Sequence, residues 1–276
     1  MNYKTILVQM GDDERSEFRL RVAIDLARIF EAHLIGLHLV PPMPGPQAVL
    51  GLGSGNPIGV RRQRMADEAR RAGARFKKVT ARSAATSVEW RSVPFDPVKA
   101  LALQSRYVDL VVLGQPARDD DSGLDLDLVG ECLLSISRPT LLVPFVGRVE
   151  SLGRRPIIAW NASPEATRAV TDALPFLQRA ERVHIMAFNA GGRGHGELPG
   201  ADVGLWLTRH GVPVEVSEER AEEINVGELL LSRVSDLNCD LVVMGAYGRS
   251  RLRELLLGGV TQTVLESMTV PVLMSH

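Results

Sequence analysis

The sequence predicts an α/β fold built from two tandem, open, five-stranded parallel-sheet domains. Three observations lead to this prediction. The segments YVDLVVLG (107–114) and NCDLVVMG (238–245) repeat each other in register. In both halves, short β-branched runs alternate with helix-length amphipathic segments, as in parallel strands joined by helical crossovers. Runs such as DLVVMG are apolar without alternation, which suits central strands that are covered on both faces.

The strands follow from these apolar runs. In the first half we expect them near 4–10, 33–40, 87–93, 108–114 and 140–145. In the second half we expect them near 156–161, 182–188, 212–217, 240–245 and 271–275. The boundary between the copies is placed in the linker FVGRVESLGRR, which predicts domains at 1–147 and 148–276.

Helix starts carry capping residues. Ser163 and Asp96 each precede a proline, which combines an N-cap side chain with proline at the first helical position. Asn225, with Glu228 three residues later, resembles a capping box. These residues predict where helices begin and leave function open.

Composition limits the function classes. With 32 basic and 33 acidic residues the net charge is -1, which gives no reason to expect a nucleic acid or an anionic membrane as partner. Cys132 and Cys239 form no CxxC pair and fit a reducing compartment as buried free thiols. The N-terminus lacks the apolar region of a signal peptide, and no segment approaches the roughly 18 apolar residues that span a bilayer. We therefore expect a cytoplasmic protein.

Several short patterns do not support an enzyme. GLGSGN (51–56) lacks the strand-to-helix context of a dinucleotide loop, so we expect a surface loop there. His195 and Glu197 form an H-x-E without partner cysteines, which excludes a zinc deaminase. No P-loop, zinc-protease or hydrolase-elbow motif occurs. No catalytic residue or protein metal site is predicted.

The stretch CDLVVMGAYGRS (239–250) ends a predicted central strand with glycine. Ligands of open parallel sheets bind beyond the carboxyl ends of the strands. We expect Gly245 and Gly248 to turn the backbone with positive φ and to let a ligand approach the main chain closely. Arg249 and Arg251 are candidate phosphate partners.

Gly258 and Gly259 immediately precede the predicted helix VTQTVLESM. The first N–H groups of that helix, including that of Val260, and its dipole would face an anion. Thr261 can add a hydroxyl donor. An alternative stays open: RSRLRELLLGG (249–259) can form an amphipathic turn that is closed by a glycine C-cap, with its arginines in solvent.

The glycine pattern resembles that of the universal stress protein family. Nucleotide-binding members of that family carry Gly-x2-Gly-x9-Gly followed by Ser, Thr or Asn, and Gly245, Gly248 and Gly258 reproduce the spacing. The resemblance covers nearly the whole chain and implies a tandem member with the Rossmann-like, adenine nucleotide alpha hydrolase-like fold. It implies a stress-response protein whose C-terminal domain binds ATP, ADP or AMP, with Mg²⁺ accompanying ATP.

This sequence departs from the family pattern at two positions. Gly259 stands where family members offer a hydroxyl, so Thr261 would have to replace it. Asn161 stands where the family has an acidic residue at the adenosine end; an amide can donate and accept but carries no charge. Ser163 follows in the same turn and completes the candidate site.

The first copy departs further. Ala117 replaces the second glycine, and the acidic run 119–121 would repel phosphate, while Asp12 follows the first strand. We therefore interpret the first copy as a degenerate structural partner. The resemblance also implies that TLLVPF and VPVLMSH pair within the chain to give a pseudo-two-fold pseudo-dimer, which could form a homodimer.

Two other functions remain open. One is a scaffold or regulatory module that binds no nucleotide and acts through protein contacts. The other is a slow ATP hydrolase, for which no base or metal carboxylate can be named near residues 245–261.

Overall fold

A computed structural model describes residues 2–13, 15–40, 57–83, 87–116, 125–188, 200–219, 225–246 and 258–276. The strands of the first half are β1 (Thr5–Met10), β2 (His33–Val40), β3 (Val88–Pro94), β4 (Leu110–Gly114) and β5 (Thr140–Val143). Its helices are α1 (Ser16–Phe30), α3 (Pro57–Thr80), α4 (Pro97–Gln104) and α5 (Leu126–Ser135), with a short 3₁₀ turn, η1 (Ser105–Tyr107).

The second half repeats this order. Its strands are β6 (Pro156–Trp160), β7 (Val183–Phe188), β8 (Val214–Glu219), β9 (Leu241–Gly245) and β10 (Val272–Ser275). Its helices are α6 (Pro164–Asp172), α7 (Leu174–Leu177), α8 (Ala201–Arg209), α9 (Val226–Asp236) and α10 (Gly259–Ser267). Each strand lies within two residues of its predicted range.

All strands belong to one ten-stranded sheet with the order β3-β2-β1-β4-β5-β10-β9-β6-β7-β8. Neighbours within each half are parallel, as predicted. β5 and β10 are antiparallel, with Leu141 opposite Leu273. The prediction that the two last strands meet within the chain is therefore confirmed, and this pairing removes two sheet edges from solvent.

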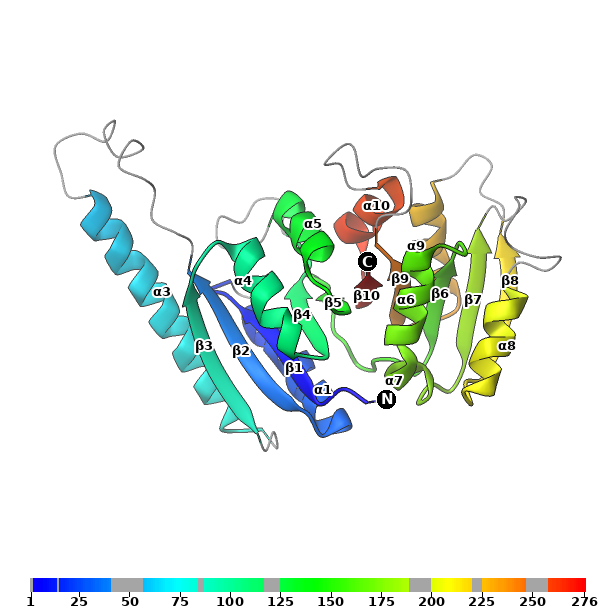
Figure 1. The fold of residues 1–276 in the computed structure, drawn as a ribbon, viewed down its shortest axis with the longest axis horizontal. Helices are drawn as coiled ribbons and strands as arrows, with labels where there is room; N and C mark the ends of the chain where they lie inside the picture. The colour runs from blue at the N-terminus through cyan, green and yellow to red at the C-terminus, as the bar shows by residue number, and fades with distance from the viewer. Residues whose placement is uncertain are drawn as a thin grey trace.

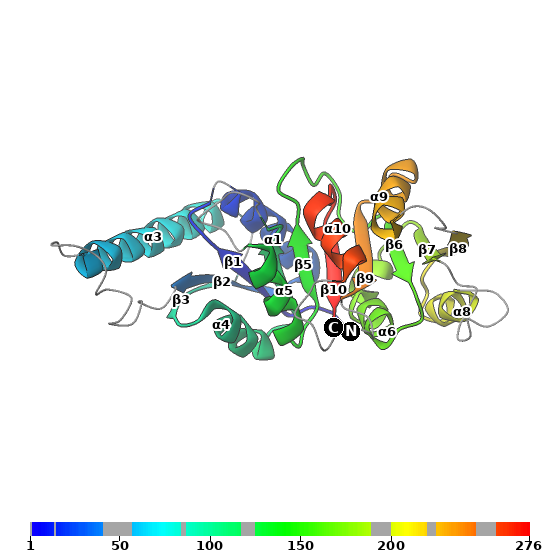
Figure 2. The same ribbon diagram turned by 90° about the horizontal axis from the view of Figure 1, so that it is seen from above.

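The helices cover both faces of the sheet, and each face has its own core. Residues of α1, α6, α7 and α8 contribute to one buried apolar cluster, and residues of α4, α5, α9 and α10 to the other. Both views place the two halves end to end, with β5 and β10 between them, α3 at one end and α8 at the other (Figures 1 and 2). Among the described helices, none is both long and apolar enough to cross a membrane.

The predicted helix caps are present. The side chain of Asp96 accepts a hydrogen bond from the N–H of Lys99 at 3.0 Å, and that of Asn225 accepts from Gly227 at 2.7 Å. The second bond of a capping box, in which the N–H of Asn225 would donate to the carboxylate of Glu228, is not found among the hydrogen bonds of the described residues. Asn225 is therefore a simple N-cap.

Gln115 links the two halves on one side of the sheet. It follows β4, and its amide Nε2 donates to the main-chain oxygen of Leu265 in α10 at 2.9 Å. Its Oε1 accepts from the N–H of Phe145, just after β5, at 2.7 Å. One amide thus satisfies main-chain groups from both halves.

Candidate functional site

Gly245 ends β9, and the first turn of α6 packs directly against it. A β-carbon at this position would lie 2.6 Å from the main-chain nitrogen of Ala166 and 2.7 Å from the carbonyl carbon of Glu165. The described glycines with positive φ do not include Gly245, so the expectation of a positive φ is wrong there. Close packing of α6 explains this glycine, because no larger residue fits between the strand and the helix.

Unlike Gly245, Gly258 and Gly259 are not explained by close packing. Gly258 is the N-cap of α10 with φ -58° and ψ 136°, a conformation open to any residue. A β-carbon on Gly259 would meet nothing within 4 Å, and one on Gly258 would meet only the hydroxyl of Thr261 at 4.0 Å. Within the described part of the chain, neither conformation nor packing requires these two glycines. No described residue fills the space beside Gly259, in front of this helix N-terminus.

The start of α10 offers N–H donors that no described residue accepts from. The first intrahelical bond runs from the N–H of Gln262 to the oxygen of Gly258 at 2.9 Å. The N–H groups of Gly259, Val260 and Thr261 therefore precede the hydrogen-bond ladder. Because β9 and β10 are parallel neighbours, the helix between them begins at the carboxyl end of β9, where ligands of such sheets bind.

Thr261 is the hydroxyl nearest to this opening. The residue is only 4% exposed, and no hydrogen bond joins its hydroxyl to another described residue. The hydroxyl of Thr263, by contrast, donates back to the oxygen of Gly259 at 2.9 Å. Of these two hydroxyls, that of Thr261 is therefore the one we consider for a ligand.

Asn161 and Ser163 shape the turn between β6 and α6. The Oδ1 of Asn161 accepts from the N–H of Ser163 at 3.1 Å, and the Oγ of Ser163 accepts from the N–H of Ala166 at 3.1 Å. Ala162, between them, has a φ of 55°. Asn161 thus presents its Nδ2 as a donor, while Ser163 serves mainly as the N-cap.

The structure brings the predicted residues to the ends of two adjacent strands and one helix. β6 pairs with β9, so Asn161 and Gly245 follow neighbouring strands, and Gly258 to Thr261 begin the next helix. Gly248, Arg249 and Arg251 lie outside the described residues, as do the glycine segments 51–56 and 191–199.

Sequence reasoning gave Glu165 no role. This residue belongs to the first turn of α6 and packs beside Gly245. Its carboxylate oxygen Oε2 is buried and has no hydrogen-bond partner. An acid after a proline at a helix start is common, so the sequence contained no clear signal for anything more.

In the first half, an arginine side chain lies against Gly114, the glycine that corresponds to Gly245. Arg19 of α1 is 4% exposed; its Nε donates to the oxygen of Gln9 at 2.7 Å and its Nη2 to Asp13 at 3.1 Å. The Nη1 of Arg19 occupies the place where a β-carbon on Gly114, the last residue of β4, would lie. Asp12 is engaged by Arg71 at 2.7 Å. Ion pairs within the protein thus occupy the carboxyl ends of β1 and β4 in the first half.

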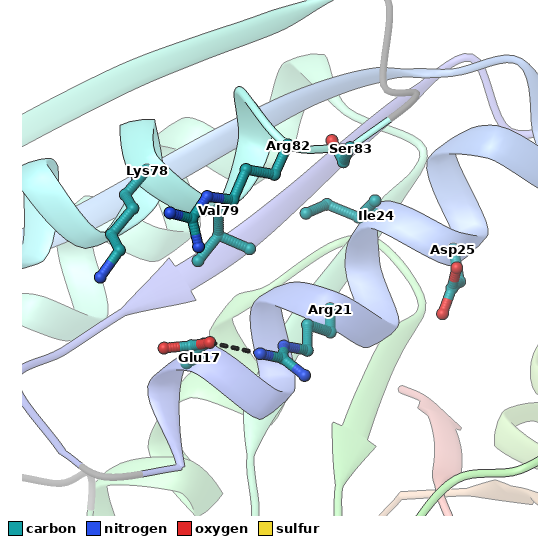
Figure 3. Close-up of a pocket in the computed structure, with 8 residues that line it drawn as sticks. All are labelled: Glu17, Arg21, Ile24, Asp25, Lys78, Val79, Arg82 and Ser83. Atoms are coloured by element: carbon teal, nitrogen blue, oxygen red, sulfur yellow. Dashed lines mark hydrogen bonds and ion pairs between the residues drawn. The ribbon is translucent and has the colours of Figure 1, made fainter.

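A cavity away from this candidate site lies between α1 and the end of α3 (Figure 3). Its volume is about 360 Å³, and Figure 3 shows Lys78 of α3 and Arg82, which follows that helix, opposite the ion pair of Arg21 with Glu17 on α1. Lys78 lies in the last turn of α3, where a helix dipole favours cations. Glu17 would repel an anion from the same space. This cavity is therefore a poor candidate site.

The described residues offer little to acid–base or metal chemistry. No group of three or more His, Cys, Asp or Glu within them could hold a metal ion. The two cysteines are free and buried, as the sequence predicted, and burial raises the pKa of both Cys132 and Cys239 to about 12. Both thiols therefore stay protonated near neutral pH.

Comparisons with known proteins match almost the whole chain. The model of the universal stress protein family matches residues 2–143 and 160–276. The predicted division at 147/148 falls between these ranges and stays a prediction. A universal stress protein from Archaeoglobus fulgidus superposes with a TM-score of 0.74 at 17% identity, covering 98% of this chain and 95% of its own.

A second solved structure shows the same fold. A functionally unknown protein from Pseudomonas aeruginosa superposes with a TM-score of 0.60 at 16% identity, covering 99% of this chain and 92% of its own. No curated protein matches significantly by sequence. At these identities the structural likeness shows the fold alone.

Proposed function

The chain belongs to the universal stress protein family, and from that membership we propose that its second half binds an adenine nucleotide in a stress response. The observation that carries the proposal is that, among the described residues, only the hydroxyl of Thr261 comes within 4 Å of where β-carbons on Gly258 and Gly259 would lie. The described residues give no structural reason for glycine at either position, yet both precede free N–H groups at a helix start. An anion is the ligand that such a place favours.

Each residue then has a physical role. The N–H groups of Gly259, Val260 and Thr261 hold phosphate oxygens, and the hydroxyl of Thr261 takes the place of the hydroxyl that Gly259 lacks. The Nδ2 of Asn161 donates to an acceptor on the base, because its Oδ1 is already used. Gly248 and Arg249 keep their assignment from the sequence.

A magnesium ion that accompanies ATP would take ligands mainly from phosphate oxygens and water. We expect Mg²⁺ to enter with ATP and to be unnecessary for AMP.

The proposal assigns one nucleotide to each chain. In the first half, Arg19 and Asp13 occupy the end of β1 and leave the guanidinium against Gly114. A nucleotide there would have to displace a buried ion pair, which is strongly unfavourable.

Mass spectrometry of small molecules released from freshly purified, denatured protein tests the proposal first. Calorimetry with ATP, ADP and AMP, with and without Mg²⁺, should then give close to one site per chain. Absence of both a released nucleotide and any binding heat at millimolar ligand would overturn the proposal and favour the scaffold hypothesis.

A variant assigns the binding to the glycines. Gly259→Leu should fold normally, because a β-carbon there meets no described residue within 4 Å, yet it should weaken nucleotide binding at least about ten-fold by filling the phosphate position. Gln262→Leu, on the exposed side of the same helix, is the matched control and should change affinity less than about two-fold.

A further inference from the structure

Glu165 is partly exposed as a residue, but one of its two carboxylate oxygens is buried. Its Oε2 has no hydrogen-bond partner, although its main chain is fixed against Gly245 at the end of β9. Among the described side chains, only the Nε of Arg15 shares this condition, and the Nη2 of that arginine already donates to Pro144 and Gly147. Glu165 is therefore the described carboxylate whose surroundings call for a missing partner.

An unpaired buried carboxylate oxygen is costly. Burying a charged acceptor without a hydrogen bond loses its hydration and gains nothing in return. Such a group persists when something absent from the bare chain, such as a ligand, a water molecule or an ion, supplies the donor.

The position of Glu165 in the fold indicates which of these partners supplies the donor. β9 lies beside β6, whose following residue Asn161 is assigned to the base, and α10, assigned to the phosphates, begins after the same end of β9. In any nucleotide the sugar joins base and phosphates. The residue packed against the end of β9 is thus positioned for the sugar.

We propose that the carboxylate of Glu165 accepts hydrogen bonds from the ribose hydroxyls of the bound nucleotide and makes the site selective for ribonucleotides. This inference rests on the proposed function and names the group that reads the sugar. It adds a carboxylate to a site in which Asn161 carries no charge.

A neutral donor fits this place better than a cation. Glu165 follows Pro164 in the first turn of α6, and the positive end of that helix opposes a metal ion beside the carboxylate. No cluster of three potential metal ligands lies among the described residues, so a cation would find a single carboxylate here. A hydroxyl donor is neutral, so the helix dipole does not oppose it, and it needs no further ligands.

The test compares ATP and AMP with their 2′-deoxy and 3′-deoxy analogues by calorimetry. The proteins are the full-length wild type, Glu165→Ala and Glu165→Gln. Glu228→Gln is the matched control, because it removes the same charge from the first turn of α9 in the same half. Wild type and control should bind the ribonucleotide at least about ten-fold more tightly than one of the deoxy analogues.

Glu165→Ala should reduce that ratio to within about two-fold by weakening the ribonucleotide alone. Its ligand-free form should melt at or above the wild-type temperature, because the substitution removes an unpaired buried acceptor. A large fall in melting temperature would instead show a structural role and would overturn the proposal. Glu165→Gln keeps the side-chain volume and serves if Glu165→Ala does not fold.

The remaining outcomes separate the two levels of the argument. If wild type binds nucleotide and the ribo-to-deoxy ratio is the same in all proteins, the role of Glu165 is wrong and the proposed function stands. If Glu165→Ala changes only the dependence on Mg²⁺, the missing partner is a cation and the ribose assignment is wrong. If wild type binds no nucleotide, both fail together.

Discussion

The hydroxyl of Tyr3 donates a 2.6 Å hydrogen bond to the main-chain oxygen of Asp172, 169 residues further along the chain. Tyr3 precedes β1 in the first half, and Asp172 ends α6 in the second. The ring of Tyr3 also lies 5.0 Å from that of Phe30 and 5.5 Å from that of Phe176. This contact joins the two halves beyond the β5–β10 pair, so their stabilities should be coupled.

Tyr3→Phe tests that coupling. The ring contacts remain, but the oxygen of Asp172 loses its donor, so we expect the free energy of unfolding to fall by about 1–2 kcal/mol. Urea denaturation measures the change. Tyr107→Phe is the control, since Tyr107 is 76% exposed and should shift stability by less than about 0.5 kcal/mol. Equal stability of Tyr3→Phe and wild type would contradict this role.

We also expect wild type and Tyr3→Phe to differ in how their free energy of unfolding depends on pH. Burial, followed by the nearby carboxylates of Asp172 and Asp109, raises the pKa of Tyr3 well above its usual value of 10. Above pH 10 the unfolded chain therefore releases this proton first, and wild-type stability should fall as pH rises. Tyr3→Phe lacks the group and should show a shallower fall between about pH 10 and 11.

Gly245→Ala should destabilise the second half strongly. Its β-carbon would collide with the main chain of Ala166 and Glu165, which cannot move aside without displacing α6. We expect a loss of about 3 kcal/mol, measured by thermal or urea unfolding. Gly259→Ala is the matched control: its β-carbon meets nothing within 4 Å in the described part of the chain, and alanine suits a helix, so stability should be unchanged or rise by up to about 1 kcal/mol. Similar losses in both variants would refute the distinction between these glycines.

That distinction also marks what the sequence could predict. The repeat, the strands, the caps and the pairing of the last strands follow from local patterns and from the resemblance, and the structure confirms them. The reason for Gly245 could not be found in that way, because it depends on how closely α6, about 80 residues earlier, approaches the end of β9. The spacing of glycines in the sequence is the same whether Gly245 is needed for close packing of α6 or for the approach of a ligand.

Arg19 and Glu165 show the same limit. In the sequence, Arg19 is one of several charged residues in an amphipathic helix; only the fold places its guanidinium against Gly114, 95 positions away, and pairs it with Asp13. Glu165 follows an ordinary helix cap, and its unpaired oxygen becomes visible only once burial is known. Both features depend on tertiary packing, which sequence spacing does not report.

The Arg19–Asp13 pair gives the next prediction. Both side chains are at least nine-tenths buried, so Arg19→Met leaves the carboxylate of Asp13 without its partner. We expect a loss of about 3–5 kcal/mol in unfolding free energy. Arg19→Met/Asp13→Leu should recover much of that loss, because no buried charge remains. A double variant less stable than Arg19→Met would contradict the pairing.

The cysteines should be unreactive in the folded protein. Burial, with a further contribution from nearby carboxylates, raises the pKa of Cys132 and Cys239 to about 12. At pH 8 the thiolate fraction is then about three orders of magnitude below that of an ordinary cysteine. Reaction with a chromogenic disulfide should be very slow in buffer and should reach two thiols per chain in denaturant. Rapid reaction of either thiol in buffer would show that it is accessible.

Gly259→Ser tests the departure from the family pattern. It places a hydroxyl directly after Gly258, where the family offers one to the phosphates, and none of the described residues lies within 4 Å of its β-carbon. Stability should therefore change by less than about 0.5 kcal/mol, and the affinity for ATP should rise roughly three- to ten-fold if the proposed site is correct. Calorimetry measures both the affinity and the number of sites.

Gly259→Ala separates the hydroxyl from the added carbon. If the phosphates lie against the start of α10, the alanine variant should bind no more tightly than wild type, because its methyl group takes up space without donating a hydrogen bond. Serine and alanine variants of equal affinity would place the phosphates elsewhere. In Gly259→Ser, a subsequent Thr261→Val change should cost less affinity than it costs in wild type, since two hydroxyls near one phosphate partly replace each other. An unchanged cost would show that Thr261 and residue 259 face different groups.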